Sequence, residues 1–342
     1  MEKKQRLVGP DIIRAIAIFL VFSVHMVAIS GANKSDVPDI KWMMGTFTRF
    51  ASLASVPLFL LLTGYFQNRK KLSTKHYLSG IPLLVTYFII AALIAVVQGK
   101  TVGLPNGVAH TVVNIFDFTY GYGWYVEIYL CLFALLPFFN MLIEALDRKK
   151  FQLLIGILIG ITILPNFVAN LLVEGVWLQI VPDFLKDMYV ITYYFLGAYI
   201  ARYQPQVNRW LCVGLGMAVV AAETGVSYLL HGWKYNWHLF SEFSDLPHLM
   251  VVLCVFLCFY RAAPKNKALC TVAREISTCS FEMYLLSYFT DHVLYTMLPL
   301  PAWQVLLINF AATYVLARLL RFVTVPLGQL LCNSAEKLCR RS

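Results

Sequence analysis

The sequence predicts an all-α membrane protein: a polytopic helix bundle with about ten transmembrane helices and with both termini in the cytoplasm. Three observations predict this class. Of the 342 residues, 59% are hydrophobic and only 13% are charged, against about 25% charged residues in a typical soluble domain. The apolar residues fall in runs whose usual length, about 20 residues, is what a helix needs to cross a bilayer. Lys and Arg gather in short segments between these runs, as topology-determining charges do.

Ten apolar runs are the candidate spans, and two of them, the sixth and the eighth, are short. In chain order the expected spans are 11–31, 47–67, 77–97, 124–145, 151–172, 188–202, 210–231, 247–261, 278–298 and 303–325. The longest gap, about 98–123, is expected to be a loop. Residues 1–342 are therefore expected to form a single integral membrane domain. Pro57, Pro82, Pro137 and Pro165 interrupt otherwise helical runs, which membrane helices tolerate when neighbours satisfy the freed carbonyls.

The first run is expected to be a retained helix and not a cleaved signal peptide. Lys3 to Arg6 precede it, as basic residues precede a secretory signal. The run itself is longer than most secretory apolar regions and carries Asp11, Arg14 and His25. Such signals are usually shorter and lack these side chains.

The placement of Lys and Arg predicts the orientation, because cytoplasmic loops carry an excess of basic residues. With the N-terminus inside, the inner segments hold most of them: Lys3, Lys4, Arg6, Arg69, Lys70, Lys71, Lys75, Arg148, Lys149, Lys150, Arg202, Arg209, Arg261, Lys265, Lys267, Arg274, Lys337, Arg340 and Arg341. The outer loops hold only Lys34, Lys41, Lys100, Lys186 and Lys234. This alternation requires an even number of spans.

The net charge of +10 is explained by this topology, so nucleic acid is not expected as a partner. The eight cysteines lie mostly inside apolar runs, and none combines with histidines at the spacing of a zinc site. They are interpreted as small packing residues, and no metal is expected. The lipid bilayer is the expected environment, and the sequence leaves the oligomeric state open.

Ionisable residues inside spans are costly and are functional candidates by default. At about 100° per residue, His25 lies about 20° from the direction of Arg14, and Asp11 lies about 40° from that of His25. Asp11 and Arg14 are three residues apart and can pair. His25 stands about 16 Å further along the same side of the helix. The three together are a stronger candidate than His25 alone, which could also be a hydrogen-bonded packing residue.

Further acidic and histidine side chains occupy other expected spans. Glu127 lies near the outer end of the fourth span, where it could fix the tautomer of His25, or be an exposed carboxylate among interfacial aromatic residues. Asp291, His292 and Glu223 could line the same cavity or be satisfied structural groups. The sequence contains no Ser–His–Asp order, nucleophile elbow or HExxH motif. These residue types point to a histidine acid/base site in a membrane cavity, without indicating what enters it.

Several stretches resemble the acyltransferase-three family, over nearly the whole chain. They are Gly9–Arg14 with His25 eleven residues after Arg14, Val56–Tyr65, Trp124–Tyr129 with Pro137, Tyr194–Gly197 and Ser280–Ser287. Thr63 stands where the family usually has serine, and Ser287 stands where it has histidine. The second departure leaves the role of position 287 open, and His292 is about half a helical turn away from that direction.

The resemblance implies transfer of an acetyl group from cytoplasmic acetyl-CoA to a hydroxyl of a cell-surface or lipid-linked glycan. It also implies a multi-pass protein of the plasma membrane, in a bacterium. His25 would be the general base, Arg14 would stabilise negative charge, and Asp11 would hold Arg14. Arg69, Lys70 and Lys71 would bind the CoA phosphates, with Tyr65 beside them. Alternatively, the only role of these basic residues could be to set the orientation of the neighbouring helices in the membrane.

Two questions stay open in this interpretation. Direct transfer and an acyl-histidine intermediate are both compatible with the residues. The alternative function is a transporter or flippase for a glycan or small anion, in which His25 and Glu127 relay protons. A transporter commonly shows two related halves with helices broken at corresponding positions, and the sequence shows no such halves.

Overall fold

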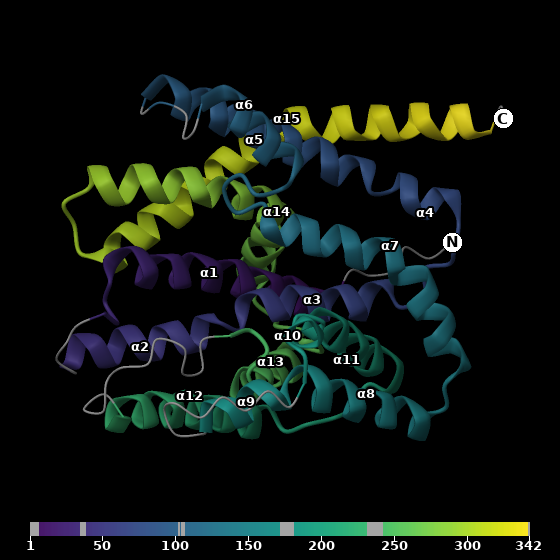
Figure 1. Cartoon of the computed structure of the whole chain (residues 1–342), viewed down its shortest axis with the longest axis vertical. Coiled ribbons are helices and arrows are strands. Elements are labelled where there is room, and N and C mark those ends of the chain that lie inside the picture. Colours follow the sequence, from purple (N-terminus) through teal and green to yellow (C-terminus); the bar gives the residue numbers. More distant parts are fainter. Residues whose placement is uncertain are drawn as a thin grey trace. The chain divides into compact units, whose positions relative to one another are not determined.

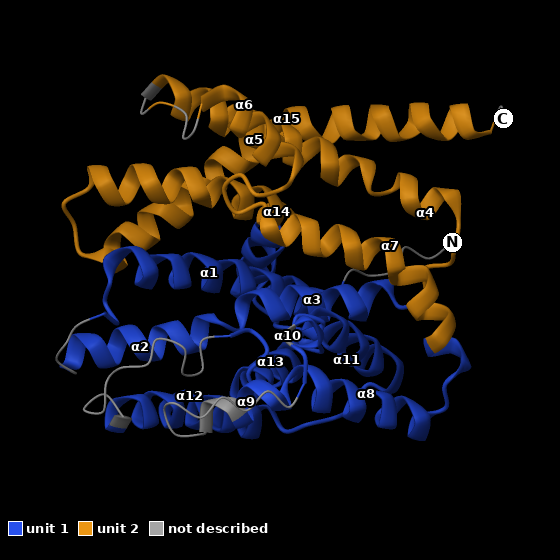
Figure 2. Cartoon of the chain, viewed as in Figure 1, with its two compact units in different colours: residues 1–68, 143–277 blue, residues 69–142, 278–342 orange. Residues whose placement is uncertain are grey.

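The computed structural model describes residues 7–34, 39–101, 103, 107–171, 181–230 and 242–340. These residues form helices and no strand, so the prediction of an all-α protein is confirmed. The helices group into two compact units, shown in blue and orange in Figure 2, and each unit combines two separate stretches of the chain. Unit 1 contains residues 1–68 and 143–277, and unit 2 contains residues 69–142 and 278–342.

Unit 1 is built from α1 to α3 and from the helices of the middle of the chain (Figure 1). Its helices are α1 (Val8–Ser30), α2 (Ile40–Ser52), α3 (Ser55–Gln67), α8 (Arg148–Thr162), α9 (Leu164–Leu171), α10 (Asp183–Lys186), α11 (Tyr189–Tyr203), α12 (Arg209–Leu230) and α13 (Leu246–Phe259). The first part of α14 (Lys267–Met297), up to Ser277, also belongs to it.

Unit 2 contains the rest of α14 together with four other helices and most of a fifth. They are α4 (Thr74–Leu78), α5 (Ile81–Thr101), α6 (Gly107–Phe116), α15 (Ala302–Cys339) and α7 (Trp124–Ala145) up to Leu142. Helix α15 packs along α5 and contacts α4. The expectation of a single membrane domain over residues 1–342 stays a prediction.

Six helical segments among the described residues are long and apolar enough to cross a membrane. They are Val8–Ser30, Ile40–Gln67, Thr74–Lys100, Trp124–Ala145, Arg209–Leu229 and Ala302–Cys339. Each overlaps an expected span. The other four expected spans coincide with shorter helices, namely α8 with α9, α11 and α13, or with α14, which carries several charges. The number of ten spans and the cytoplasmic position of the termini stay predictions.

Proline explains two breaks inside expected spans. An uninterrupted helix would place the ring of Pro57 against the carbonyl of residue 53, and the chain instead ends α2 at Ser52 and begins α3 at Ser55. Pro165 likewise stands in the first turn of α9, just after α8 ends at Thr162. Pro137 is accommodated inside α7.

The expectation of a loop over about 98–123 is wrong in part. Helix α5 continues to Thr101, and α6 occupies residues 107–116. The sequence of α6 is apolar and contains several valines, but it is only 10 residues long. A helix of this length is too short to cross a bilayer, so the criterion of about 20 apolar residues does not detect it.

The tightest helix crossing in unit 1 joins α3 to α11. A Cβ atom added to Gly64 would lie 2.0 Å from the carbonyl oxygen of Tyr194, and one added to Gly197 would lie 2.0 Å from the carbonyl oxygen of Leu61. Both glycines therefore let the two backbones touch, as small residues do between membrane helices. This contact fixes α3, which packs in turn against α1.

Candidate functional site

Asp11 and Arg14, near the start of α1, are joined by a serine from α14 that sequence reasoning missed. Ser277 Oγ donates a hydrogen bond of 2.7 Å to Asp11 Oδ1, and Arg14 Nη1 donates one of 3.1 Å to Ser277 Oγ. Asp11 is buried, with 4% of its surface exposed. The family resemblance implies that Asp11 holds Arg14, and in the structure Ser277 forms a bridge between their side chains.

Arg14 also lies over an aromatic ring. Its guanidinium carbon is 6.0 Å from the centroid of the Phe66 ring on α3, within the range of a cation–π contact. The guanidinium is thus held between α14 and α3, with part of its surface accessible. A cation placed in this way, partly removed from water, can stabilise negative charge strongly because the local dielectric constant is low.

His25 lies on the same helix, two residues before the last buried residue of α1, Val27. It is half-buried, and the neighbouring residues Phe22 and Ser23 are buried. A histidine that is partly accessible can exchange a proton with a bound molecule, and histidine is the side chain that most often acts as a general base in enzymes.

Glu127 lies in the first turn of α7 and is exposed. Within the described residues its carboxylate forms no ion pair. A carboxylate in a first helical turn is favoured by the helix dipole, which gives it a structural role without any partner. Glu127 belongs to unit 2 and His25 to unit 1, so their expected pairing stays a prediction.

The residues expected to bind CoA are also divided between the two units. Arg69, Lys70 and Lys71 are exposed in unit 2, in the segment between α3 and α4. Asn140 Nδ2 donates a hydrogen bond of 2.8 Å to the carbonyl oxygen of Lys70 and so fixes the segment. Tyr65 lies in unit 1, half-buried between the rings of Phe66 and Phe256.

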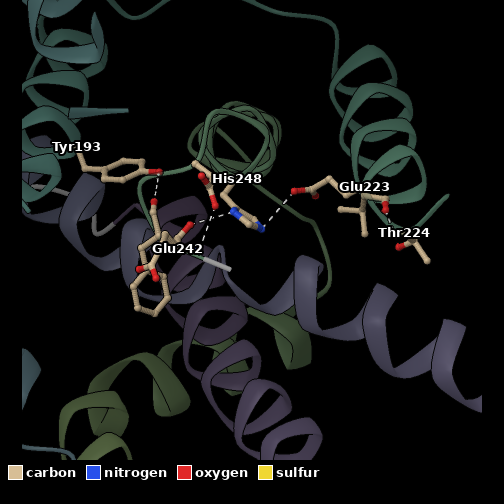
Figure 3. A network of polar contacts seen from close by, with 8 residues as sticks. Tyr193, Glu223, Thr224, Glu242 and His248 are labelled. Carbon is tan, nitrogen blue, oxygen red and sulfur yellow. Dashed lines mark hydrogen bonds and ion pairs between the residues drawn. The ribbon is translucent and has the colours of Figure 1, made fainter. Parts of the chain in front are cut away.

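A second polar cluster lies inside unit 1, and its central histidine was not singled out from the sequence. His248 on α13 is fully buried, and its Nε2 lies 3.4 Å from Oε1 of Glu223 on α12. Its Nδ1 lies 3.1 Å from the carbonyl oxygen of Glu242. Figure 3 shows the His248 ring between these two groups. The only sequence signal was a histidine directly after Pro247, at the start of an expected span.

The segment before α13 is held by the same cluster. Asp245 Oδ2 accepts a hydrogen bond of 3.1 Å from the backbone nitrogen of Glu242, and Tyr193 donates one of 3.0 Å to the carbonyl oxygen of Phe243 (Figure 3). Glu223, which the sequence suggested for a cavity, is therefore part of a compact network that ties α11, α12 and α13 together.

The residues named near the end of the chain have structural contacts in unit 2. Asp291 is fully buried and accepts a hydrogen bond of 2.6 Å from Asn309 Nδ2 and one of 3.4 Å from the Tyr122 hydroxyl. His292 is exposed, and its Nδ1 lies 2.7 Å from the carbonyl oxygen of Tyr288 on its own helix. Ser287 donates to the carbonyl oxygen of Tyr284, so it closes a helical turn.

The described residues contain no group of three or more His, Cys, Asp or Glu side chains that could hold a metal ion. All eight cysteines are free thiols, and Cys212, Cys254 and Cys258 form a small buried apolar cluster. Packing is thus the role of these three cysteines.

Six helical segments of membrane-spanning length and apolar composition characterise the described part of the chain as that of a membrane protein. The chain belongs to the acyltransferase-three family, whose acyltransferase domain matches residues 7–323. It is thus a membrane acyltransferase in the general sense of that family. No curated protein and no solved structure matches the chain.

Proposed function

We propose that the chain transfers an acetyl group from acetyl-CoA to a hydroxyl group of a cell-surface or lipid-linked glycan. The observation that carries this proposal is the Asp11–Ser277–Arg14 network at one end of α1, with His25 on the same helix. Membership of the acyltransferase-three family supports the acyl-transfer chemistry. We further propose that the protein lies in the plasma membrane of a bacterium, with the donor on the side of Arg69, Lys70 and Lys71.

In this mechanism His25 is the general base. A sugar hydroxyl is a weak nucleophile, so neutral His25 removes its proton as the oxygen attacks the thioester carbonyl carbon. The new carbon–oxygen bond forms, the carbon–sulfur bond breaks, and the CoA thiolate takes up the proton that His25 carries. No proton or electron is left over.

Arg14 provides the positive charge that this reaction needs, either for the oxyanion or for the phosphates of the donor. The Ser277 hydroxyl accepts a hydrogen bond from Arg14 and donates one to Asp11. The guanidinium is therefore already oriented before the donor binds. Preorganised charge is effective because it requires no rearrangement during the reaction.

The test is transfer of radiolabelled acetyl groups from acetyl-CoA to glycan in membranes containing the chain or its His25→Ala variant. Loss of a general base lowers rates by about 10²–10⁴-fold, so we expect glycan labelling to fall by at least 100-fold. His292→Ala is the matched control, because this exposed histidine bonds within its own helix, and it should retain full activity.

Equal labelling by the wild-type chain and the His25→Ala variant would overturn the role of His25. A complete lack of acetyl transfer to a panel of glycans, together with pH-dependent uptake of glycan into vesicles, would favour a transporter instead.

A further inference from the structure

The last helix, α15, is too long to lie entirely within a bilayer. Its 38 residues, Ala302–Cys339, extend about 57 Å at 1.5 Å per residue, whereas the hydrocarbon core is about 30 Å thick. The expected span ends at residue 325 and the family match ends at residue 323. We propose that residues 327–340, called the tail below, lie along the membrane surface beside the basic segment 69–71 and bind anionic lipid headgroups.

One side of the tail is held against α4 and α5, within unit 2. A Cβ atom added to Gly328 would lie 2.9 Å from the Cα atom of Pro82, at the start of α5. Cys332 Sγ donates a hydrogen bond of 3.3 Å to the carbonyl oxygen of Leu78 in α4. The tail therefore has a defined rotation about its axis, and its remaining surface faces away from α4 and α5.

A second side of the tail is exposed and mostly apolar, with Ser334 as its one polar residue. Leu327, Leu330, Leu331 and Leu338 are exposed by 38%, 61%, 44% and 68%. At about 100° per residue, these four leucines fall within a sector about 100° wide. A row of exposed leucines on a fixed helix marks an interaction surface.

The third side of the tail is polar. Gln329, Asn333, Lys337 and Arg340 are all exposed, and they fall within a sector about 80° wide that directly adjoins the apolar one. Side chains of this kind exclude the tail from the hydrocarbon core. An apolar side next to a polar, basic side is the arrangement of helices that lie in the membrane interface.

The positive charge of the side chains around the tail indicates that the lipid headgroups are anionic. The exposed basic side chains in this region of unit 2 are Arg69, Lys70, Lys71, Lys75, Lys337 and Arg340. The single acidic residue of the tail, Glu336, lies 3.8 Å from Arg340 and is half-buried. The segment 69–78 contains no acidic residue. A positive surface of this kind is attracted to anionic lipid headgroups.

The experiment compares two label positions in the full-length chain, after replacement of its native cysteines and confirmation of monodisperse elution. Cys332 is replaced by serine, so that a donor to the carbonyl oxygen of Leu78 is kept. Leu331→Cys carries a spin label in the apolar sector, and Asn333→Cys carries one in the polar sector as a matched control. Collision with oxygen, which concentrates in lipid, and with a water-soluble nickel chelate is measured in nanodiscs of phosphatidylglycerol or phosphatidylcholine.

In phosphatidylglycerol we expect the oxygen-to-nickel accessibility ratio at position 331 to exceed that at position 333 at least fivefold. Lys337→Glu with Arg340→Glu should remove most of this difference, as should phosphatidylcholine. Equal nickel access at both positions in phosphatidylglycerol would overturn the proposal, as would an undiminished difference in phosphatidylcholine. Dipolar broadening at position 331 between labelled copies would also overturn it, by showing that a second chain covers the leucines.

Discussion

At the scale of single residues, Ser277 is the side chain that links Asp11 to Arg14 in the α1 site. Its hydroxyl is the only atom that both accepts from Arg14 and donates to Asp11 in the hydrogen bonds described above. The Ser277→Ala variant removes both bonds without adding volume. A lost hydrogen bond to a buried charged group costs about 1.5–3 kcal/mol, so Asp11 and Arg14 lose much of their fixed geometry.

We therefore expect Ser277→Ala to reduce acetyl transfer by at least tenfold and to lower the temperature at which the detergent-solubilised protein aggregates. Thr271→Ala on the same helix is the control, because the exposed Thr271 hydroxyl bonds only to the carbonyl oxygen of Lys267. Ser277→Thr should restore part of the activity. Unchanged transfer by Ser277→Ala would show that the orientation of Arg14 is irrelevant to the reaction.

The Glu223–His248 pair gives a second prediction at this scale. Removing one partner leaves the other buried polar group without this contact, at a typical cost of about 1–3 kcal/mol, whereas replacing both with apolar groups of similar shape can be nearly neutral. We expect Glu223→Leu and His248→Leu each to destabilise the protein in thermal unfolding, and the double variant to be closer to the wild type. If the two effects simply add, the pair makes no specific contribution.

At the scale of helices, the contact between α3 and α11 depends on two glycines. Gly64→Ala or Gly197→Ala would place a methyl group against a carbonyl oxygen of the other helix, and the helices would have to separate. We expect each variant to lose most of its folded yield and its thermal stability. Gly160→Ala on α8 is the control, since nothing lies within 4 Å of an added Cβ atom there.

The control should be neutral or slightly stabilising, because alanine is favoured over glycine in a helix by about 0.5–1 kcal/mol. If Gly64→Ala is tolerated as well as Gly160→Ala, α3 and α11 do not touch through their backbones.

The helices also show what the sequence could predict and what it could not. Long apolar runs such as that of α1 can be recognised in the sequence because a helix that crosses a bilayer needs about 20 consecutive, mostly apolar residues. The break between α2 and α3 has a local cause in Pro57, which the sequence analysis named. Ser277 and His248 were missed because their importance comes from Asp11 and Glu223, which are distant in sequence, and single residues do not reveal such contacts. Helix α6 was missed because it is short.

At the scale of the whole molecule, the orientation in the membrane is the prediction that most needs measurement. The distribution of Lys and Arg predicts that both termini lie in the cytoplasm. A C-terminal fusion to green fluorescent protein should therefore be fluorescent in a bacterial host, and a fusion to alkaline phosphatase should be inactive. The opposite pair of results would place the tail of α15 outside the cell, and would require either an odd number of spans or an N-terminus outside the cytoplasm.

The bridge between α1 and Ser277 has a consequence for biogenesis. Asp11 and Ser277 are separated by 266 positions, and a ribosome adding about 5–20 residues per second needs roughly 15–50 s to synthesise the chain between them. During that interval the first helix already carries a carboxylate and a guanidinium but has not yet met its serine. The two charges must neutralise each other, or be shielded by the insertion machinery, until α14 has been synthesised and Ser277 completes the α1 site.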